Sequence, residues 1–328
     1  MPKSHSTIEV TRLAPSPTGA LHLGNARTFL VNWALARRSG WSIILRIEDL
    51  DSPRIKKWAS EQAVEDLRWL GIDYDSGPVY QSHDLSPYRE AMEYLVRKDL
   101  AFPCKLSRKE IEQALSAPHG GELRYDPSLR SLTGKISAAN KTLTQNEFHP
   151  GESINWRFKT RDRVVSFQDC FAGKVEINPW AEVGDFVIWT KSGLPAYQLA
   201  VVIDDYNQNI SQVVRGDDLL SSTGRQILLQ EALGYTSKPT YTHLPLVSGP
   251  DGRRLAKRHG DTRIAFYREQ GVSSSRIIGL IAYWCGICPQ PVQMNSEEFA
   301  EELRLERIPH EPVTMTAEAE KWLQHGVW

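Results

Sequence analysis

A stretch near the N-terminus contains the residue types that bind a phosphate chain. Residues 12–25 read RLAPSPTGALHLGN, in which two prolines and a glycine interrupt an apolar alternation. From Leu23 onward, apolar residues recur at helical spacing. A strand, a turn and a helix start in this order direct backbone N–H groups and the positive helix end to one spot. We therefore expect a nucleotide phosphate beside His22, Gly24 and Asn25, with His22 donating a hydrogen bond.

Charged side chains follow two further predicted strands. Residues 41–49 (WSIILRIED) begin apolar and end on charges, and residues 210–216 (ISQVVRG) carry Arg215 near their end. In parallel α/β sheets, ligand sites lie beyond the carboxyl ends of strands, which places Glu48 and Arg215 near the first turn. An arginine there can hold a carboxylate through two parallel hydrogen bonds, or it can pair with one of the two aspartates that follow it.

A basic loop supplies a second group for phosphate. Residues 249–260 read GPDGRRLAKRHG, a composition typical of a clamp that closes on phosphate. Between these segments, apolar strand-like runs alternate with amphipathic helical ones, such as residues 60–70 and 86–100. This alternation predicts an α/β fold with a parallel sheet.

Composition excludes several function classes. The 328 residues carry 24% charged side chains and a net charge of −1, so any contact with nucleic acid must come from local patches. A run long and apolar enough for a membrane span is lacking, as is the apolar core of a signal peptide. The four scattered cysteines, including Cys285 and Cys288, are expected as free thiols of a cytoplasmic protein.

Four motifs together resemble the class I aminoacyl-tRNA synthetases in their glutamyl form. Residues 12–25 resemble the family's first signature, with HLGN in place of HIGH. RIEDLDSPR matches its second landmark, and AYQLAVVIDD is also similar. The basic loop resembles the KMSKS loop, although Arg254 replaces a lysine and Ala256 replaces the serine, which removes one hydrogen bond, worth about 1 kcal/mol.

The resemblance implies a Rossmann catalytic domain that activates L-glutamate with ATP, which arrives with Mg²⁺. His22 and Lys257 are the implied catalytic groups, and both would contact ATP together with Gly24 and Asn25. Glu48 would bind the ammonium group of glutamate, and Arg215 its side-chain carboxylate. Tyr197 would pack on that side chain, although a tyrosine in an apolar run is also typical of a core. The implied glutamate site comprises Arg12, Leu13, Ala14, Pro15, Ser16, Glu48, Tyr197 and Arg215.

An insertion at residues 101–184 is expected to resemble the family's acceptor-stem subdomain. Short members often bind structural zinc here, but this chain keeps Cys104 and has Leu106 and Leu129 where further cysteines would stand. Tyr125 matches a tyrosine that also binds this zinc in the family, but two ligands at most cannot close a structural site. We predict no zinc, with Leu106, Leu123 and Leu129 packing the region instead. Strand-like pieces at 153–158, 164–169 and 173–177 predict a small antiparallel patch within the insertion. Its RNA contacts, or alternatively an ordinary basic sheet edge, would be Trp156, Arg157, Lys159, Arg161 and Arg163.

The expected organisation divides the catalytic domain into residues 1–100 and 185–289, with a helical tail at 290–328. The tail is too short for the anticodon-binding domain of a full glutamyl enzyme. The chain therefore resembles the family members that activate glutamate without tRNA and attach it to the queuosine base in the anticodon loop of tRNA(Asp). A minimal enzyme charging a tRNA 3′ end, or a non-catalytic paralogue that binds nucleotide or tRNA, are the alternatives. A monomer is expected.

Overall fold

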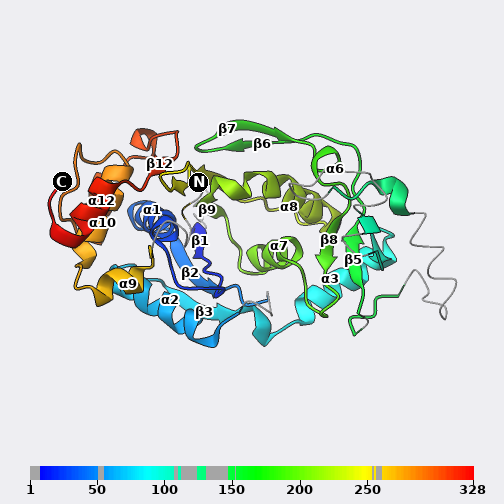
Figure 1. The fold of residues 1–328 in the computed structure, drawn as a ribbon. Coiled ribbons are helices and arrows are strands. Elements are labelled where there is room, and N and C mark those ends of the chain that lie inside the picture. The colour runs from blue at the N-terminus through cyan, green and yellow to red at the C-terminus, as the bar shows by residue number, and fades with distance from the viewer. Residues whose placement is uncertain are drawn as a thin grey trace, which may run out of the picture.

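A parallel sheet forms the centre of the molecule (Figure 1). The computed structural model describes residues 8–50, 55–106, 110–111, 124–130, 147–151, 153–252, 255 and 261–328. Within these ranges the sheet has the order β3-β2-β1-β9-β10-β6-β7, and its neighbours pair in parallel except β6 with β7. Its strands are β1 (Val10–Leu13), β2 (Ser42–Ile47), β3 (Ser76–Tyr80), β6 (Val165–Asp169), β7 (Gly173–Ile177), β9 (Gln212–Gly216) and β10 (Thr240–Leu244).

The order of the first five strands confirms the predicted doubly wound α/β fold. The chain starts at β1, builds outward through β2 to β3, and later returns to the other side of β1 with β9 and β10. The strand order therefore reverses between β1 and β9, and ligands of such sheets bind in the crevice at that point. The helices are α1 (Leu23–Ser39), α2 (Lys57–Trp69), α3 (Ser86–Arg97), α6 (Pro179–Glu182), α7 (Tyr197–Asn207), α8 (Leu220–Leu233), α9 (Ile264–Glu269), α10 (Ser274–Trp284), α11 (Ser296–Glu302) and α12 (Ala317–His325).

The strands of the insertion pair differently from the prediction. A separate antiparallel sheet joins β4 (Ala101–Cys104), β5 (Asn155–Phe158) and β8 (Phe186–Trp189) in the order β4-β5-β8. The hairpin of β6 and β7 instead extends the main sheet, where Asp169 pairs with Tyr241 of β10. The expected antiparallel patch of all three pieces is therefore wrong, because the partner of a short strand depends on distant segments of the chain.

Two buried clusters hold these layers together. The larger joins the apolar face of α1 with residues of β1 and β2 and with the C-terminal helices α10, α11 and α12. The second joins α3, α7 and α8 with β5 and β8. In Figure 1 the C-terminal helices lie at one end of the molecule and the three-stranded sheet lies near the other. The residues that the structure describes include no helix long and apolar enough to cross a membrane.

A small third cluster lies in the insertion. Leu106 and Leu129 pack there, as the sequence predicted. They pack with Cys104, whose Sγ lies 3.9 Å from the Tyr125 hydroxyl. Leu123 lies outside the described residues. Among the residues that are described, no group of three His, Cys, Asp or Glu side chains could hold a metal ion.

Candidate active site

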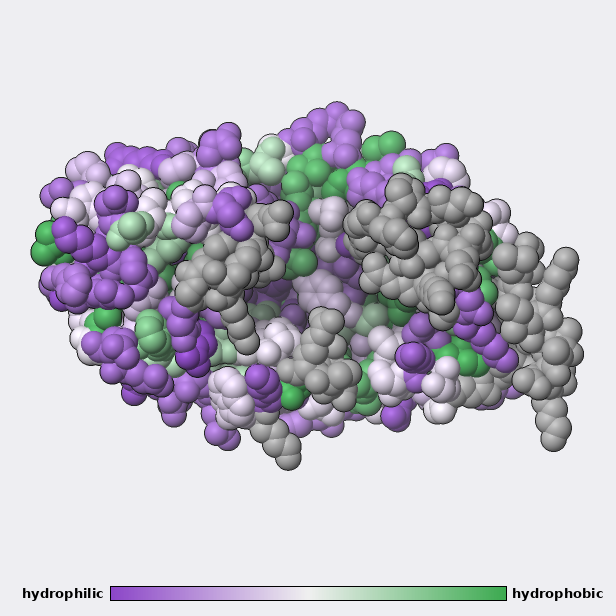
Figure 2. Space-filling model, in the orientation of Figure 1, coloured by the Kyte–Doolittle hydropathy of each residue, from purple (hydrophilic) through white to green (hydrophobic). Residues whose placement is uncertain are grey.

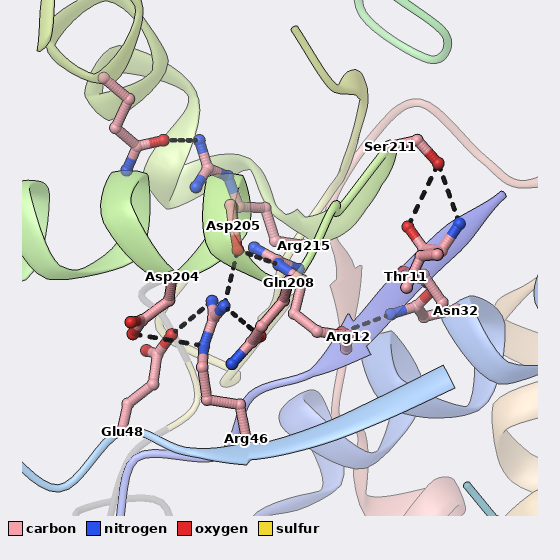
Figure 3. A network of polar contacts seen from close by, with 12 residues as sticks. Thr11, Arg12, Asn32, Arg46, Glu48, Asp204, Asp205, Gln208, Ser211 and Arg215 are labelled. Carbon is pink, nitrogen blue, oxygen red and sulfur yellow. Dashed lines mark hydrogen bonds and ion pairs between the residues drawn. The ribbon is translucent and has the colours of Figure 1, made fainter. Parts of the chain in front are cut away.

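Three arginines lie near the carboxyl ends of neighbouring strands, next to the switch point of the sheet. Arg12 belongs to β1, Arg46 to β2 and Arg215 to β9, and all three are almost fully buried. Figure 3 shows them grouped beside α7, and the space-filling view is hollowed near the middle of the molecule (Figure 2). Buried cations need anionic partners, so the acidic groups around them determine what the site can bind.

Asp205, near the end of α7, pairs with two of these arginines. Its Oδ1 lies 2.8 Å from Nη1 of Arg46 and 3.4 Å from Nε of Arg12. Burial alone would raise the pKa of Asp205, but the charges of Arg46 and Arg12 outweigh it and hold that pKa below its ordinary range. Asp205 is therefore a fixed negative charge that orients both guanidinium groups.

The neighbouring Asp204 connects the site to α3. Its carboxylate accepts hydrogen bonds from Nε2 of Gln81 at 2.6 Å and from the hydroxyl of Tyr88 at 2.8 Å. Burial is the largest effect on this group and raises the pKa of Asp204, although Arg46 opposes that change. Sequence reasoning had assigned no role to either aspartate. The signal was present, because two acidic residues that end an apolar helical run must find buried partners.

Glu48 lies between Arg46 and the turn that follows β1. Its Oε1 is 3.2 Å from Nη2 of Arg46, and its backbone N–H donates to the carbonyl of Pro15 at 3.1 Å. The hydroxyl of Ser16 donates to the carbonyl of Glu48 at 3.4 Å. Burial raises the pKa of Glu48, with the charges of Arg46 and Arg12 acting against that rise. The structure thus places Glu48 beside Pro15 and Ser16, and a carboxylate there can accept from an ammonium group.

Three hydrogen bonds hold the guanidinium of Arg215. Its Nε donates to Nε2 of His243 at 2.9 Å, and its Nη2 donates at 2.8 Å to both Thr223 and Gln226. Its Nη1 is buried and has no partner within the described part of the chain. The ion pair with Asp217 or Asp218 that the sequence left open does not form. An unpartnered buried guanidinium nitrogen fits a ligand carboxylate, because leaving it unpaired is costly.

Tyr197 begins α7 next to these charges. It is 39% exposed, which is incompatible with the core placement that its apolar surroundings also allowed. Although the residue is partly exposed, the surrounding protein desolvates its phenol and raises the pKa, an effect that the charge of Arg215 opposes and that of Glu48 reinforces. A pocket of about 320 Å³ adjoins Tyr197 and is lined also by Gln198, Arg157 and Arg225. The tyrosine therefore faces an open space between α7, α8 and the three-stranded sheet.

His22 and the start of α1 lie on the other side of the turn. Nδ1 of His22 is 3.2 Å from the hydroxyl of Thr262, whose carbonyl accepts from the backbone N–H of Leu23 at 3.0 Å. No side chain caps α1 and no acidic residue lies in its first turn, which contains Gly24 and Asn25, so its positive end suits an anion. A Cβ at Gly24 would meet Val247 at an ordinary 3.6 Å, so packing does not require the glycine.

Other predicted contacts are placed differently or fall outside the description. Lys257, Arg254 and Ala256 lie outside the described residues. Trp156 is only 2% exposed, so the expected stacking of this ring on RNA is wrong. Arg157 lies over the ring of Tyr125 at 4.2 Å. Lys159 and Arg163 form ion pairs within the protein, with Asp99 and Glu231 respectively.

Comparison with known proteins agrees with this geometry. The family model described as tRNA synthetases class I (E and Q), catalytic domain, matches residues 9–316. The Glutamyl-Q tRNA(Asp) synthetase of Rhodopirellula baltica is 46% identical over 91% of this chain and 92% of that protein. The protein of the same name from Symbiobacterium thermophilum is 43% identical over 96% of this chain and 98% of its own.

A solved structure shares the fold. The crystal structure of a glutamate tRNA ligase from Elizabethkingia meningosepticum in complex with its amino acid superposes with a TM-score of 0.78 at 28% identity. The match covers 96% of this chain and 68% of that one. Fold and site are those of a class I aminoacyl-tRNA synthetase catalytic domain. The chain belongs to the class I tRNA synthetases (E and Q), among the Glutamyl-Q tRNA(Asp) synthetases.

Proposed function

We propose that this protein activates L-glutamate with ATP and transfers the glutamyl group to the queuosine base of tRNA(Asp). The observation that carries this proposal is the match to two Glutamyl-Q tRNA(Asp) synthetases, which covers more than nine-tenths of this chain and of each relative. The unpartnered Nη1 of Arg215 adds a physical reason for an acidic amino acid. ATP is the co-substrate and brings Mg²⁺ with it.

The site residues divide into two groups in this proposal. Arg215 holds the side-chain carboxylate of glutamate, and Glu48 accepts from its ammonium group. Tyr197 covers the side chain from the solvent side. Arg12 and Leu13 at the end of β1, with the turn residues Ala14, Pro15 and Ser16, complete the site, and Asp205 keeps Arg12 in place. Glutamate is thus held by charges at both ends, which fixes its α-carboxylate.

The second group serves the phosphates. The α-carboxylate attacks the α-phosphorus of ATP and pyrophosphate leaves, so negative charge accumulates between two anions. His22, the first turn of α1 with Gly24 and Asn25, and Lys257 supply hydrogen-bond donors and positive charge to this centre. We extend the proposal to a monomer that works in the cytoplasm.

Glutamate-dependent exchange of pyrophosphate into ATP, measured with and without tRNA, tests the first step. Exchange without tRNA is the expected result. Transfer is then tested with radioactive glutamate and tRNA(Asp) that carries either queuosine or guanosine at the modified position. Label on the queuosine form alone supports the proposal. Exchange that requires tRNA, with label on a 3′ end, would instead indicate a minimal glutamyl-tRNA synthetase. ATP binding without exchange would indicate a non-catalytic paralogue.

A further inference from the structure

A buried histidine and aspartate lie behind the arginine assigned to glutamate. His243, on β10, is 1% exposed, and its Nδ1 lies 2.7 Å from Oδ2 of Asp169 at the end of β6. Its Nε2 faces Arg215, whose Nε lies 2.9 Å away, and the hydroxyl of Thr223 is 3.2 Å from the same nitrogen. The imidazole therefore bridges a carboxylate on one strand and a guanidinium on another.

The chemistry of these neighbours determines the tautomer of His243. The guanidinium of Arg215 can only donate, so Nε2 must carry the lone pair. An ionised carboxylate can only accept, so Nδ1 must carry the proton. Burial lowers the pKa of His243, and the charge of Arg215 acts in the same direction, although Asp169 opposes it. The neutral ring with its proton on Nδ1 satisfies both partners.

Asp169 is itself held in one orientation. Its Oδ1 accepts from the backbone N–H groups of Phe171 at 2.9 Å, Ala172 at 2.8 Å and His243 at 3.2 Å. Its Oδ2 is thereby directed at the imidazole. Burial alone would raise the pKa of Asp169, but the hydrogen bonds from His243 and the two loop N–H groups outweigh it and lower that pKa. The carboxylate is ionised and saturated with donors.

We propose that Asp169 and His243 are positioning residues for the amino-acid substrate, which fix Arg215 so that its Nη1 points at the carboxylate of bound glutamate. This inference rests on the proposed glutamate activation. Three N–H hydrogen bonds that Arg215 donates determine the plane of its guanidinium: one to His243, one to Thr223 and one to Gln226. The hydrogen bond from Arg215 to Nε2 of His243 forms only if the imidazole proton is on Nδ1. Asp169, which does not contact the substrate, holds that proton there.

The substitution Asp169→Asn tests the tautomer directly. The amide oxygen stays with the three backbone N–H groups, because an NH₂ group there would face three donors. The amide nitrogen then faces Nδ1 of His243 and moves the imidazole proton to Nε2, opposite Arg215. We expect the KM for glutamate in pyrophosphate exchange to rise about tenfold, with kcat and the KM for ATP unchanged. Asp66→Asn, which changes a buried carboxylate on α2, is the matched control and should leave all three values unchanged.

Two substitutions of the histidine separate positioning from anchoring. The oxygen of His243→Gln can reach the place of Nε2 and accept from Arg215, whereas the nitrogen of His243→Asn can replace Nδ1 and donate to Asp169. If His243 positions Arg215, Asn raises the KM for glutamate about tenfold and Gln raises it less. If His243 merely anchors the β6–β7 hairpin through Asp169, Gln is the more harmful change, and that result would overturn the proposal.

Nitrogen-15 NMR of the histidine ring decides the same question without any assay. The proposed positioning of Arg215 requires that the His243 ring is protonated on Nδ1 in the wild type and on Nε2 in Asp169→Asn. A wild-type ring protonated on Nε2, or an unchanged KM for glutamate in Asp169→Asn, would refute it. Absence of glutamate-dependent exchange in the wild type would contradict the proposed function instead, so the two failures are distinguishable.

Discussion

At the scale of single residues, the fork of Arg215 is the group on which substrate choice depends. Lysine keeps the positive charge but has no planar pair of donors, and it cannot satisfy His243, Thr223 and Gln226 together. We expect Arg215→Lys to reduce kcat/KM for glutamate at least 100-fold, which corresponds to a loss of about 3 kcal/mol of transition-state stabilisation. The KM for ATP in pyrophosphate exchange serves as the internal control and should stay within a factor of two or so. Equal losses for both substrates would argue for a general folding defect.

The lowered pKa of His243 predicts a pH dependence of stability. A histidine whose pKa is lowered by folding binds its proton more readily in the unfolded chain, so stability falls as the pH drops below the ordinary value of about 6.5. The groups that act on the ring are Asp169, Arg215 and Arg12. We expect the urea midpoint of the wild type to decrease from pH 7 to pH 5 by more than that of His243→Gln. Parallel curves for the two proteins would show that His243 does not titrate in this way.

Sequence reasoning could select candidate site residues that lie where a strand ends or a turn begins. Glu48 follows β2 and Arg215 lies near the end of β9, so the carboxyl-edge rule was enough to place both near Tyr197, whose pKa both charges affect. Asp169 and His243 were missed, because they are 74 residues apart and neither stands in a turn or motif. Only the pairing of β6 with β10 places them in contact, and that pairing has no local signal.

At the scale of elements, helices and turns were predictable and strand partners were not. Apolar spacing indicated the helices α1, α2 and α3, which the sequence placed from Leu23 onward, at 60–70 and at 86–100, because burial of one helix face leaves a local pattern. The strands β5 and β6 look alike in sequence but join different sheets.

The close approach of α10 to the segment that follows it depends on one helical glycine. A Cβ at Gly279 would come within 1.8 Å of the carbonyl oxygen of Val292, which is backbone and cannot rotate away. Helix propensity alone would favour alanine by about 1 kcal/mol, yet we expect Gly279→Ala to destabilise the protein by about 3 kcal/mol. Gly24→Ala, whose Cβ meets Val247 at 3.6 Å, is the matched helical control. Chemical denaturation of both variants measures the difference, and equal stabilities would contradict the argument.

At the scale of the whole molecule, the C-terminal segment completes the main core. The helix α11 packs on α1, and Ser296 donates to the carbonyl of Gly71 at 3.1 Å. Farther on, β12 (Val313–Thr314) pairs with β11 (Val247–Ser248), and the N–H of Met315 donates to the carbonyl of Ser248 at 2.8 Å. These contacts support the strand that precedes the basic loop. The segment therefore belongs to the structural frame of the site, although it carries none of the proposed chemistry.

The buried phenyl group of Phe299 allows this frame to be tested. Phe299 is fully buried among residues of the larger cluster, whereas Val292, in the same segment, is 41% exposed. We expect Phe299→Ala to lower the free energy of unfolding by about 3–5 kcal/mol, because truncation removes buried area and leaves a cavity. Val292→Ala should change it by less than about 0.5 kcal/mol. Urea unfolding measures both. At temperatures where the Phe299 variant is still folded, its KM for glutamate should match the wild type, since Phe299 lies on α11, which packs on α1 and α10, whereas Arg215 lies on β9 and Glu48 follows β2. A small loss of stability would mean that the C-terminal segment packs only loosely on the larger cluster, and it would contradict this prediction.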